Sequence, residues 1–141
     1  MTLATVVWAF TDGKAGHENQ TRGLIDALAR HRTLDVRWVR IPAYASVLTS
    51  LMTRRFLPGA DLPPPDLLIG AGHRTHLPLL AARRSRGGRA VVLMKPSLPR
   101  VWFDLCVIPE HDNVTGSKVF TTRGALNTLR PGGKQANTGL I

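Results

Sequence analysis

The chain is poor in cysteine, aromatic residues and acidic residues: its 141 residues include one, eight and nine of these, respectively. The single cysteine, Cys106, excludes an intramolecular disulfide framework, and such low cysteine usage suits the reducing cytoplasm. Because Cys106 lies in an apolar segment, we expect it to be a small buried residue. No apolar run reaches the roughly 18 residues of a membrane span. The first apolar run is only six residues long, lacks a basic lead and ends near Asp12, so we expect no secretory signal peptide.

The scarcity of acidic residues leaves a formal net charge of +10, carried by 15 arginines and 4 lysines. Such a surplus attracts nucleic acid, acidic lipid headgroups or phosphorylated ligands. The arginines cluster mostly at the ends of expected helices, where cations complement the helix dipole, so a solvated face explains much of the charge. The alternation of basic and aromatic residues that is typical of an RNA-binding sheet is missing, and we expect no nucleic-acid partner.

Short apolar runs alternate with helical patterns along the chain. Strands are expected at residues 5–10, 35–41, 67–69, 90–94, 105–108 and 119–121. Amphipathic helices are expected at residues 18–31, 44–57 and 75–86, with a rigid, extended, proline-rich connection at 58–65. This alternation predicts a three-layer, Rossmann-like α/β domain of five or six strands with a mainly parallel sheet, over residues 1–125. Residues 126–141 have a linker-like composition.

Four of the five histidines directly follow expected strands: His17, His73, His76 and His111. In an open parallel sheet, the loops after the carboxyl ends of the strands gather at one edge and form the ligand crevice. We therefore expect His17, His73 and His111 to lie on one edge of the sheet and to serve a site there.

The loop after the first strand is the densest polar stretch. Its glycines allow close approach of a ligand to the backbone, and the N-terminus of the following helix offers N–H groups to an anion. We expect His17 to act as a catalytic base or as a ligand contact, and the other expected ligand contacts are Asp12, Gly13, Lys14, Gly16 and Gln20. The spacing matches neither a Walker A loop nor a dinucleotide fingerprint. The alternative is a plain turn in which Asp or Asn caps the helix.

The loop after the third strand combines glycines with cationic and hydroxyl side chains, which suit a phosphate or a sugar hydroxyl. The expected ligand contacts are Gly70, Gly72, His73, Arg74, Thr75 and His76. The alternative is that Thr75 caps the next helix while His76 packs against it.

The loop after the fifth strand places an imidazole between two carboxylates, which can orient it for acid/base catalysis. The expected catalytic residues here are Glu110, His111 and Asp112, and the alternative is a simple turn. No histidine or cysteine spacing matches a known zinc motif, so we expect no metal and no cofactor.

Several of these stretches, in this order, resemble the mitochondrial-fission (elongated mitochondria) family of bacterial and plant proteins, which are often described as glycosyltransferases. The matching stretches are Trp8 to Gln20, Pro65 to His76, Phe103 to Leu105, Pro109 to Asp112 and Thr122 to Asn127. The resemblance implies a GT-B-like architecture, in which two Rossmann-like domains face each other across a cleft. It further implies that this chain is the N-terminal, acceptor-side half and that residues 126–141 lead toward a second domain.

For function, the resemblance implies one domain of a nucleotide-sugar-dependent glycosyltransferase that is inactive alone. The acceptor would be a sugar or a lipid-linked molecule, and the second domain would bind most of the nucleotide sugar. His17 would be the base, with Lys14 and Arg74 stabilising the departing diphosphate. The alternatives are a non-catalytic adaptor linked to membrane or organelle division and a nucleotide-sugar epimerase-like enzyme.

The segment from Tyr44 to Leu57 fits either a helix on a membrane surface or a helix packed on the core. Its apolar side and the adjoining Arg54 and Arg55 suit a helix that lies on an anionic membrane surface, so a cytoplasmic protein could be peripheral to the membrane. An ordinary core-packing helix with a cationic C-terminus fits the pattern equally well.

Overall fold

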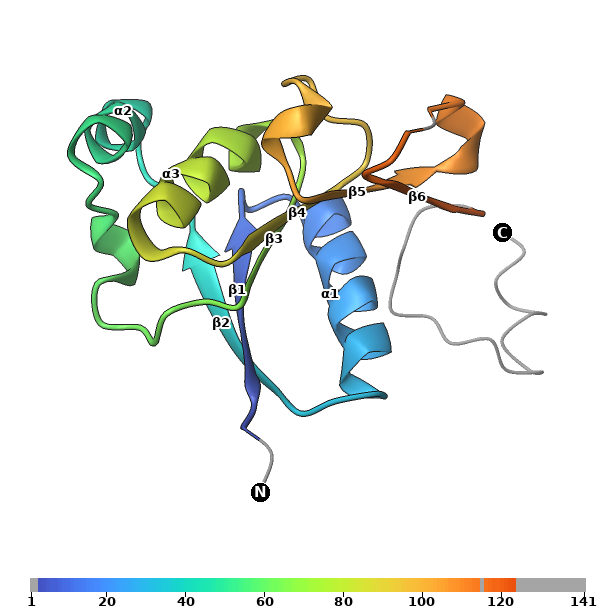
Figure 1. The fold of residues 1–141 in the computed structure, drawn as a ribbon, viewed down its shortest axis with the longest axis horizontal. Helices are drawn as coiled ribbons and strands as arrows, with labels where there is room; N and C mark the ends of the chain where they lie inside the picture. Colours follow the sequence, from blue (N-terminus) through green and yellow to red (C-terminus); the bar gives the residue numbers. More distant parts are fainter. Residues whose placement is uncertain (1–2, 115, 124–141) are drawn as a thin grey trace.

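The computed structural model describes residues 3–114 and 116–123 and contains one six-stranded sheet with three α-helices (Figure 1). The strands are β1 (Thr5–Thr11), β2 (Leu34–Arg40), β3 (Leu67–Ala71), β4 (Arg89–Leu93), β5 (Leu105–Pro109) and β6 (Val119–Thr122). The helices are α1 (Ala15–Ala29), α2 (Tyr44–Thr53) and α3 (His76–Arg86). Four short 3-10 turns are η1 (Leu57–Gly59), η2 (His73–Thr75), η3 (Arg100–Trp102) and η4 (Glu110–Asp112). All adjacent strands pair in parallel, which confirms the predicted α/β fold.

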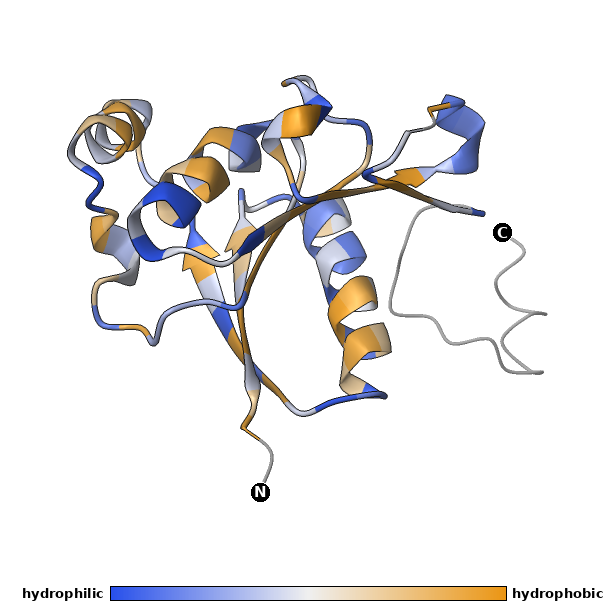
Figure 2. Ribbon diagram, viewed as in Figure 1, coloured by the Kyte–Doolittle hydropathy of each residue, from blue (hydrophilic) through white to orange (hydrophobic). Residues whose placement is uncertain are grey.

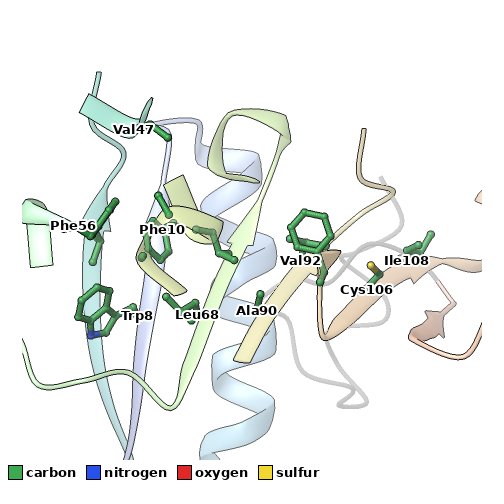
Figure 3. Close-up of a cluster of buried hydrophobic side chains, with 14 of the residues drawn as sticks. Trp8, Phe10, Val47, Phe56, Leu68, Ala90, Val92, Cys106 and Ile108 are labelled. Carbon is green, nitrogen blue, oxygen red and sulfur yellow. The ribbon is translucent and has the colours of Figure 1, made fainter. Parts of the chain in front are cut away.

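The sheet forms the middle of three layers because its strands bury apolar side chains on both faces. Helix α1 covers one face, and α2 and α3 cover the other (Figure 1). Within β1, Trp8 and Phe10 pack toward α2 and α3, whereas Val7 and Ala9 pack toward α1. The hydropathy colouring shows the apolar strands between these helices (Figure 2). Cys106 is fully buried in the core on the α2 and α3 side, as expected (Figure 3).

The strand order is β2-β1-β3-β4-β5-β6, so the direction of winding reverses at β1. The chain leaves β1 through α1 to reach β2 on one side, and it later returns to β3 on the other side of β1. The loops after β1 and β3 therefore diverge toward opposite faces at neighbouring strand ends. In open α/β sheets, this switch point is where ligands bind.

The connection between α2 and β3 is held against the sheet by Trp8. The indole Nε1 of Trp8 donates to the carbonyl of Pro63 at 3.0 Å, and the guanidinium of Arg86 lies 5.4 Å from the Trp8 ring. Arg86 also donates to the carbonyls of Gly59 at 2.6 Å and Leu62 at 2.8 Å. A Cβ atom at Gly59 would lie 2.2 Å from the Trp8 ring, so only glycine fits. The expectation of a rigid, extended 58–65 connection was wrong at its start, because the 3-10 turn η1 spans Leu57–Gly59.

The helix ends differ from the expected ones for local reasons. Helix α1 begins at Ala15 rather than residue 18, and the Glu18 N–H already donates to the Lys14 carbonyl at 3.0 Å. Helix α2 stops at Thr53 rather than residue 57, because Arg54 adopts a left-handed conformation with φ 58° and caps the helix. The chain then turns so that Phe56 enters the core. The expected tail, residues 126–141, lies outside the described residues.

Candidate functional site

The predicted site histidines follow the carboxyl ends of strands at one edge of the sheet. His17 lies in the first turn of α1 after β1, His73 begins η2 after β3, and His111 lies in η4 after β5. Because every strand is parallel, these positions share the edge at which the strands end (Figure 1). The prediction of a common edge is confirmed.

An Asp–His pair occupies the end of β1. Nδ1 of His17 lies 2.8 Å from Oδ2 of Asp12, and the Lys14 N–H donates to Oδ1 of Asp12 at 3.0 Å. The Asp12 side chain is 1% exposed, and that of His17 is 24% exposed. The sequence indicated both residues but not their pairing.

The protonation state of Asp12 sets the tautomer of His17. Burial raises the pKa of Asp12, but the hydrogen bonds from the Lys14 N–H and the His17 ring outweigh it and hold the pKa below its ordinary value of 3.8. Asp12 is therefore a carboxylate at neutral pH, and a carboxylate only accepts hydrogen bonds. Nδ1 of His17 must then carry the proton and donate it, which leaves Nε2 as the basic atom.

The backbone of the loop after β3 supports the His17 ring. Gly72 has φ 96°, and a Cβ atom there would lie 2.4 Å from Nδ1 of His17. Glycine is required at this position both for its conformation and for the close approach of the imidazole. The loops after β1 and β3 thus meet at the switch point of the sheet.

The loop after β4 contacts residues that follow both β1 and β3. The side-chain amide of Gln20 donates to Sδ of Met94 at 3.2 Å, and Nδ1 of His73 is hydrogen-bonded to the Ser97 hydroxyl. Met94 itself has φ 72°, a strained conformation for a residue with a side chain. Met94 and Ser97 were not predicted as site residues, although they also follow the carboxyl end of a strand, and the rule that selected the histidines applies equally to them.

Two further groups of the first loop hold its shape. The Thr11 hydroxyl donates to Oε2 of Glu18 and accepts the Gly13 N–H at 3.0 Å, so the turn is tied to the first turn of α1. Gly13 and Gly16 have open space where a Cβ atom would stand, and Gly13 is left-handed with φ 87°. Thr11 and Glu18 were also missed, because a threonine and a glutamate seven residues apart form no recognised motif.

The two expected cationic contacts are available to a ligand. Lys14 and Arg74 are exposed, on the loops that follow β1 and β3. Their side chains form no hydrogen bond or ion pair with any residue of 3–114 or 116–123. Both are thus free to meet an anionic group at this edge of the sheet.

Three residues of the second loop, Gly70, Thr75 and His76, are buried rather than exposed at this edge of the sheet. The Thr75 hydroxyl donates to the Gly72 carbonyl at 2.8 Å instead of capping α3, and a Cβ atom at Gly70 would lie 2.7 Å from that hydroxyl. His76 is 2% exposed, and both of its ring nitrogens lack a hydrogen-bond partner among the described residues. Burial, together with the nearby His73, lowers the pKa of His76 to about 4. His76 packs as a neutral ring 5.4 Å from the Phe103 ring, as the packing alternative describes.

The third predicted loop is separate from the Asp–His pair. His111 has a side chain that is 71% exposed, and its Nε2 lies 3.6 Å from Oδ1 of Asp112, too far for a hydrogen bond. Glu110 is also exposed. Within the described part of the chain, no hydrogen bond or ion pair joins η4 to the loops after β1 and β3. The geometry of η4 is that of a simple turn.

The described residues contain no group of three or more histidine, cysteine, aspartate or glutamate side chains that could hold a metal ion. This edge of the sheet offers an oriented imidazole, two exposed cations and backbone N–H groups. Such a set can accept a proton from a hydroxyl and can bind an anion.

A family model described as "Mitochondrial fission ELM1" matches residues 15–139. The chain belongs to this family. The match begins at Ala15, so it includes His17, Gln20 and the whole of the loop after β3, whereas Asp12 precedes it. The family assignment agrees with the resemblance that the motifs indicated.

A curated protein of similar sequence is an uncharacterized protein of Rickettsia prowazekii (strain Madrid E). It is 26% identical over 113 residues, which cover 75% of this chain and 32% of the relative. The chain thus spans about a third of the length of that relative. No solved structure matches the chain.

Proposed function

We propose that this chain is the acceptor-side part of a glycosyltransferase of the mitochondrial fission ELM1 family, with His17 as its general base. The observation that carries the proposal is the hydrogen bond between Nδ1 of His17 and the buried carboxylate of Asp12. An imidazole held in this way at the switch point of a parallel sheet is suited to deprotonating a bound hydroxyl.

The proposed reaction is an inverting transfer. Nε2 of His17 takes the proton of the acceptor hydroxyl as its oxygen forms a bond to the anomeric carbon of the nucleotide sugar. The bond from that carbon to the phosphate oxygen breaks, and the nucleoside diphosphate leaves with the electron pair. Asp12 stabilises the imidazolium that results, as the carboxylate of a catalytic triad does.

Two exposed cations support the departure of the diphosphate. Lys14 and Arg74 project from the two loops that flank the switch point, and neither is neutralised by a described residue. Positive groups that meet charge as it develops on the leaving group stabilise the transition state. The nucleotide sugar itself, and a sugar or lipid-linked acceptor, follow from the family resemblance. Groups from a second domain would complete the site, so we expect the 141 residues alone to show no transfer.

The test uses the longest natural protein that contains these residues, incubated with UDP- and GDP-linked hexoses and with membrane and soluble acceptor fractions. Release of the nucleoside diphosphate is measured over a range of pH. We expect His17→Ala to lower turnover by roughly 10²- to 10⁴-fold. Asp12→Asn should also lower turnover, because the neutral amide of the new asparagine cannot stabilise an imidazolium at His17 as a carboxylate does.

The matched control is His31→Ala. His31 is an exposed histidine beyond the C-terminal end of α1, at the opposite edge of the sheet from the site, so its replacement should leave turnover unchanged. Unchanged turnover of His17→Ala would remove His17 from the role of base. Robust transfer by the isolated 141 residues would contradict the need for a second domain.

A further inference from the structure

Helix α2 presents three large apolar side chains to solvent. Tyr44, Leu48 and Met52 recur every four residues on its exposed side, where Tyr44 is 66% and Met52 84% exposed. The residues that α2 buries fully are Val47 and the small Ser50. A core-packing helix has the opposite arrangement, with its large apolar residues inside and polar residues outside. Core packing therefore does not account for the exposed side of α2.

The apolar surface continues onto the 3-10 turn η3. Val101 and Trp102 are exposed there, at 73% and 46%. A groove of about 480 Å³ lies between α2, α3 and η3 and is lined by Leu51, Leu80, Arg83, Arg84, Val101 and Trp102. The hydropathy colouring marks hydrophobic segments on α2 and on the turn that contains η3 (Figure 2). We call Tyr44, Leu48, Met52, Val101 and Trp102 the α2–η3 surface.

The α2–η3 surface is surrounded mainly by positive charge, and no acidic residue lies on α2, α3 or η3. No aspartate or glutamate occurs in residues 36–60 or 67–103, the two stretches that contain α2, α3 and η3. The side chains of Arg54, Arg55 and Arg100 form no hydrogen bond or ion pair with any other described residue. The next acidic residue along the chain, Asp104, is paired with Arg83 at 2.9 Å. A partner for this surface must therefore be both apolar and anionic.

We propose that the α2–η3 surface docks onto an anionic lipid bilayer. Its aliphatic and aromatic side chains enter the interface between headgroups and acyl chains, and Arg54, Arg55 and Arg100 contact acidic headgroups. Among the described residues, no helix is long and apolar enough to cross a membrane. The contact is therefore one in which α2 lies along the membrane surface.

The docking surface borders the candidate site. A cleft of about 170 Å³ is lined by Tyr44, Val47 and Leu98 and also by His73 and Arg74 of the loop after β3. Docking through α2 thus brings the bilayer next to the edge that carries His17. The docking proposal stands independently of the proposed chemistry, because binding to vesicles is measured without any turnover.

The test is co-sedimentation of the purified chain with two kinds of vesicle: phosphatidylcholine alone, and phosphatidylcholine mixed with phosphatidylglycerol. We expect binding only to the anionic vesicles, and we expect it to weaken as salt is raised. Arg54→Glu/Arg55→Glu should weaken binding at least about tenfold, because each cation near an anionic bilayer contributes measurably. Leu48→Ser/Met52→Ser should weaken it similarly at unchanged net charge.

The matched control is Arg30→Glu/Arg32→Glu. It makes the same change in net charge with two exposed arginines that follow α1, the helix on the other face of the sheet from α2 and α3. It should leave vesicle binding within about twofold of the parent chain at moderate salt, where distant charges are screened. Circular dichroism and thermal unfolding confirm that each variant is folded.

Three outcomes would overturn the proposal. The first is no binding to anionic vesicles at low salt. The second is an equal loss of binding in the Arg30→Glu/Arg32→Glu control, which would show a nonspecific charge effect. The third is a concentration-dependent dimer, seen by sedimentation velocity and abolished by Leu48→Ser/Met52→Ser, which would assign the surface to self-association.

Discussion

Replacement of Gly72 by alanine tests whether the His17 ring lies on the backbone of the neighbouring loop. The backbone of Gly72, with φ 96° and ψ 147°, belongs to a region that is almost exclusive to glycine. A Cβ atom there would also lie 2.4 Å from Nδ1 of His17. Gly72→Ala therefore has two costs, one from the backbone and one from the displaced imidazole.

Gly87 separates the two costs. It has φ 84° and ψ −162°, in the same region of backbone conformation, but a Cβ atom at Gly87 meets nothing within 4 Å. Gly87→Ala should lower the free energy of unfolding by about 1–3 kcal/mol through backbone strain alone. Gly72→Ala should lower it by roughly 1–3 kcal/mol more, because the ring must move and weaken its hydrogen bond to Asp12.

The assay is urea unfolding at neutral pH, followed by circular dichroism, for the single variants and for Gly72→Ala combined with His17→Ala. Removal of the His17 ring makes room for the new methyl group, so the cost of Gly72→Ala in that background should fall to the cost of Gly87→Ala. The expected coupling between positions 17 and 72 is about 1 kcal/mol or more. Equal costs for the two glycine variants, or a coupling below about 0.5 kcal/mol, would refute the inferred contact.

Three other predictions concern stability and pH. The pKa of His76 is about 4 in the folded protein and 6.5 ordinarily, so the unfolded chain binds the proton more tightly. The free energy of unfolding is therefore highest above pH 6.5 and falls by about 3 kcal/mol as the pH drops toward 4. Urea unfolding of His76→Leu should lack this fall, whereas His31→Ala should keep it. Asp12 has a lowered pKa in the folded protein, so its contribution to the free energy of unfolding is present above its ordinary pKa of 3.8 and is lost as the pH falls through the folded value. In urea unfolding, Asp12→Asn should therefore lack this acid-dependent part of the stability. Asp104 accepts the Ala90 N–H at 2.7 Å and pairs with Arg83, so Asp104→Ala should lower the urea midpoint by an amount equivalent to about 1–3 kcal/mol, and an unchanged midpoint would contradict this role.

The sheet could be predicted from the sequence because its strands are short, continuous apolar runs. The expected β4, residues 90–94, is displaced by one residue from Arg89–Leu93, and the expected β1 lacks only Thr11. Helix ends were less predictable. Lys14 is the N-cap residue of α1 but its side chain makes no capping hydrogen bond, and Arg54 is the C-cap residue of α2 in a left-handed conformation that arginine seldom adopts. Neither position carries the residue type that usually marks a helix boundary.

The candidate site was predictable as a set of loops but not as a set of contacts. The rule that loops after parallel strands share an edge placed His17, His73 and His111 correctly. It could not show that β3 lies beside β1, which brings Gly72 against the His17 ring. Nor could it show that η4 follows β5, a strand that lies two positions from β3 in the sheet. The helical spacing also does not distinguish the buried His76 from the exposed His73.

The packing of Trp8 against the connection after η1 has a consequence for how this chain can vary in length. The carbonyls of Gly59, Leu62 and Pro63 accept hydrogen bonds from the Arg86 guanidinium or the Trp8 indole, so an added residue between Gly59 and Pro63 would shift a carbonyl away from its donor. Arg54 and Arg55 are exposed, and their side chains form no hydrogen bond within the described chain. Insertions and deletions should therefore be accepted between α2 and Phe56, where they change how α2 is presented. They should be rejected a few residues later, where the same change would unseat a core tryptophan.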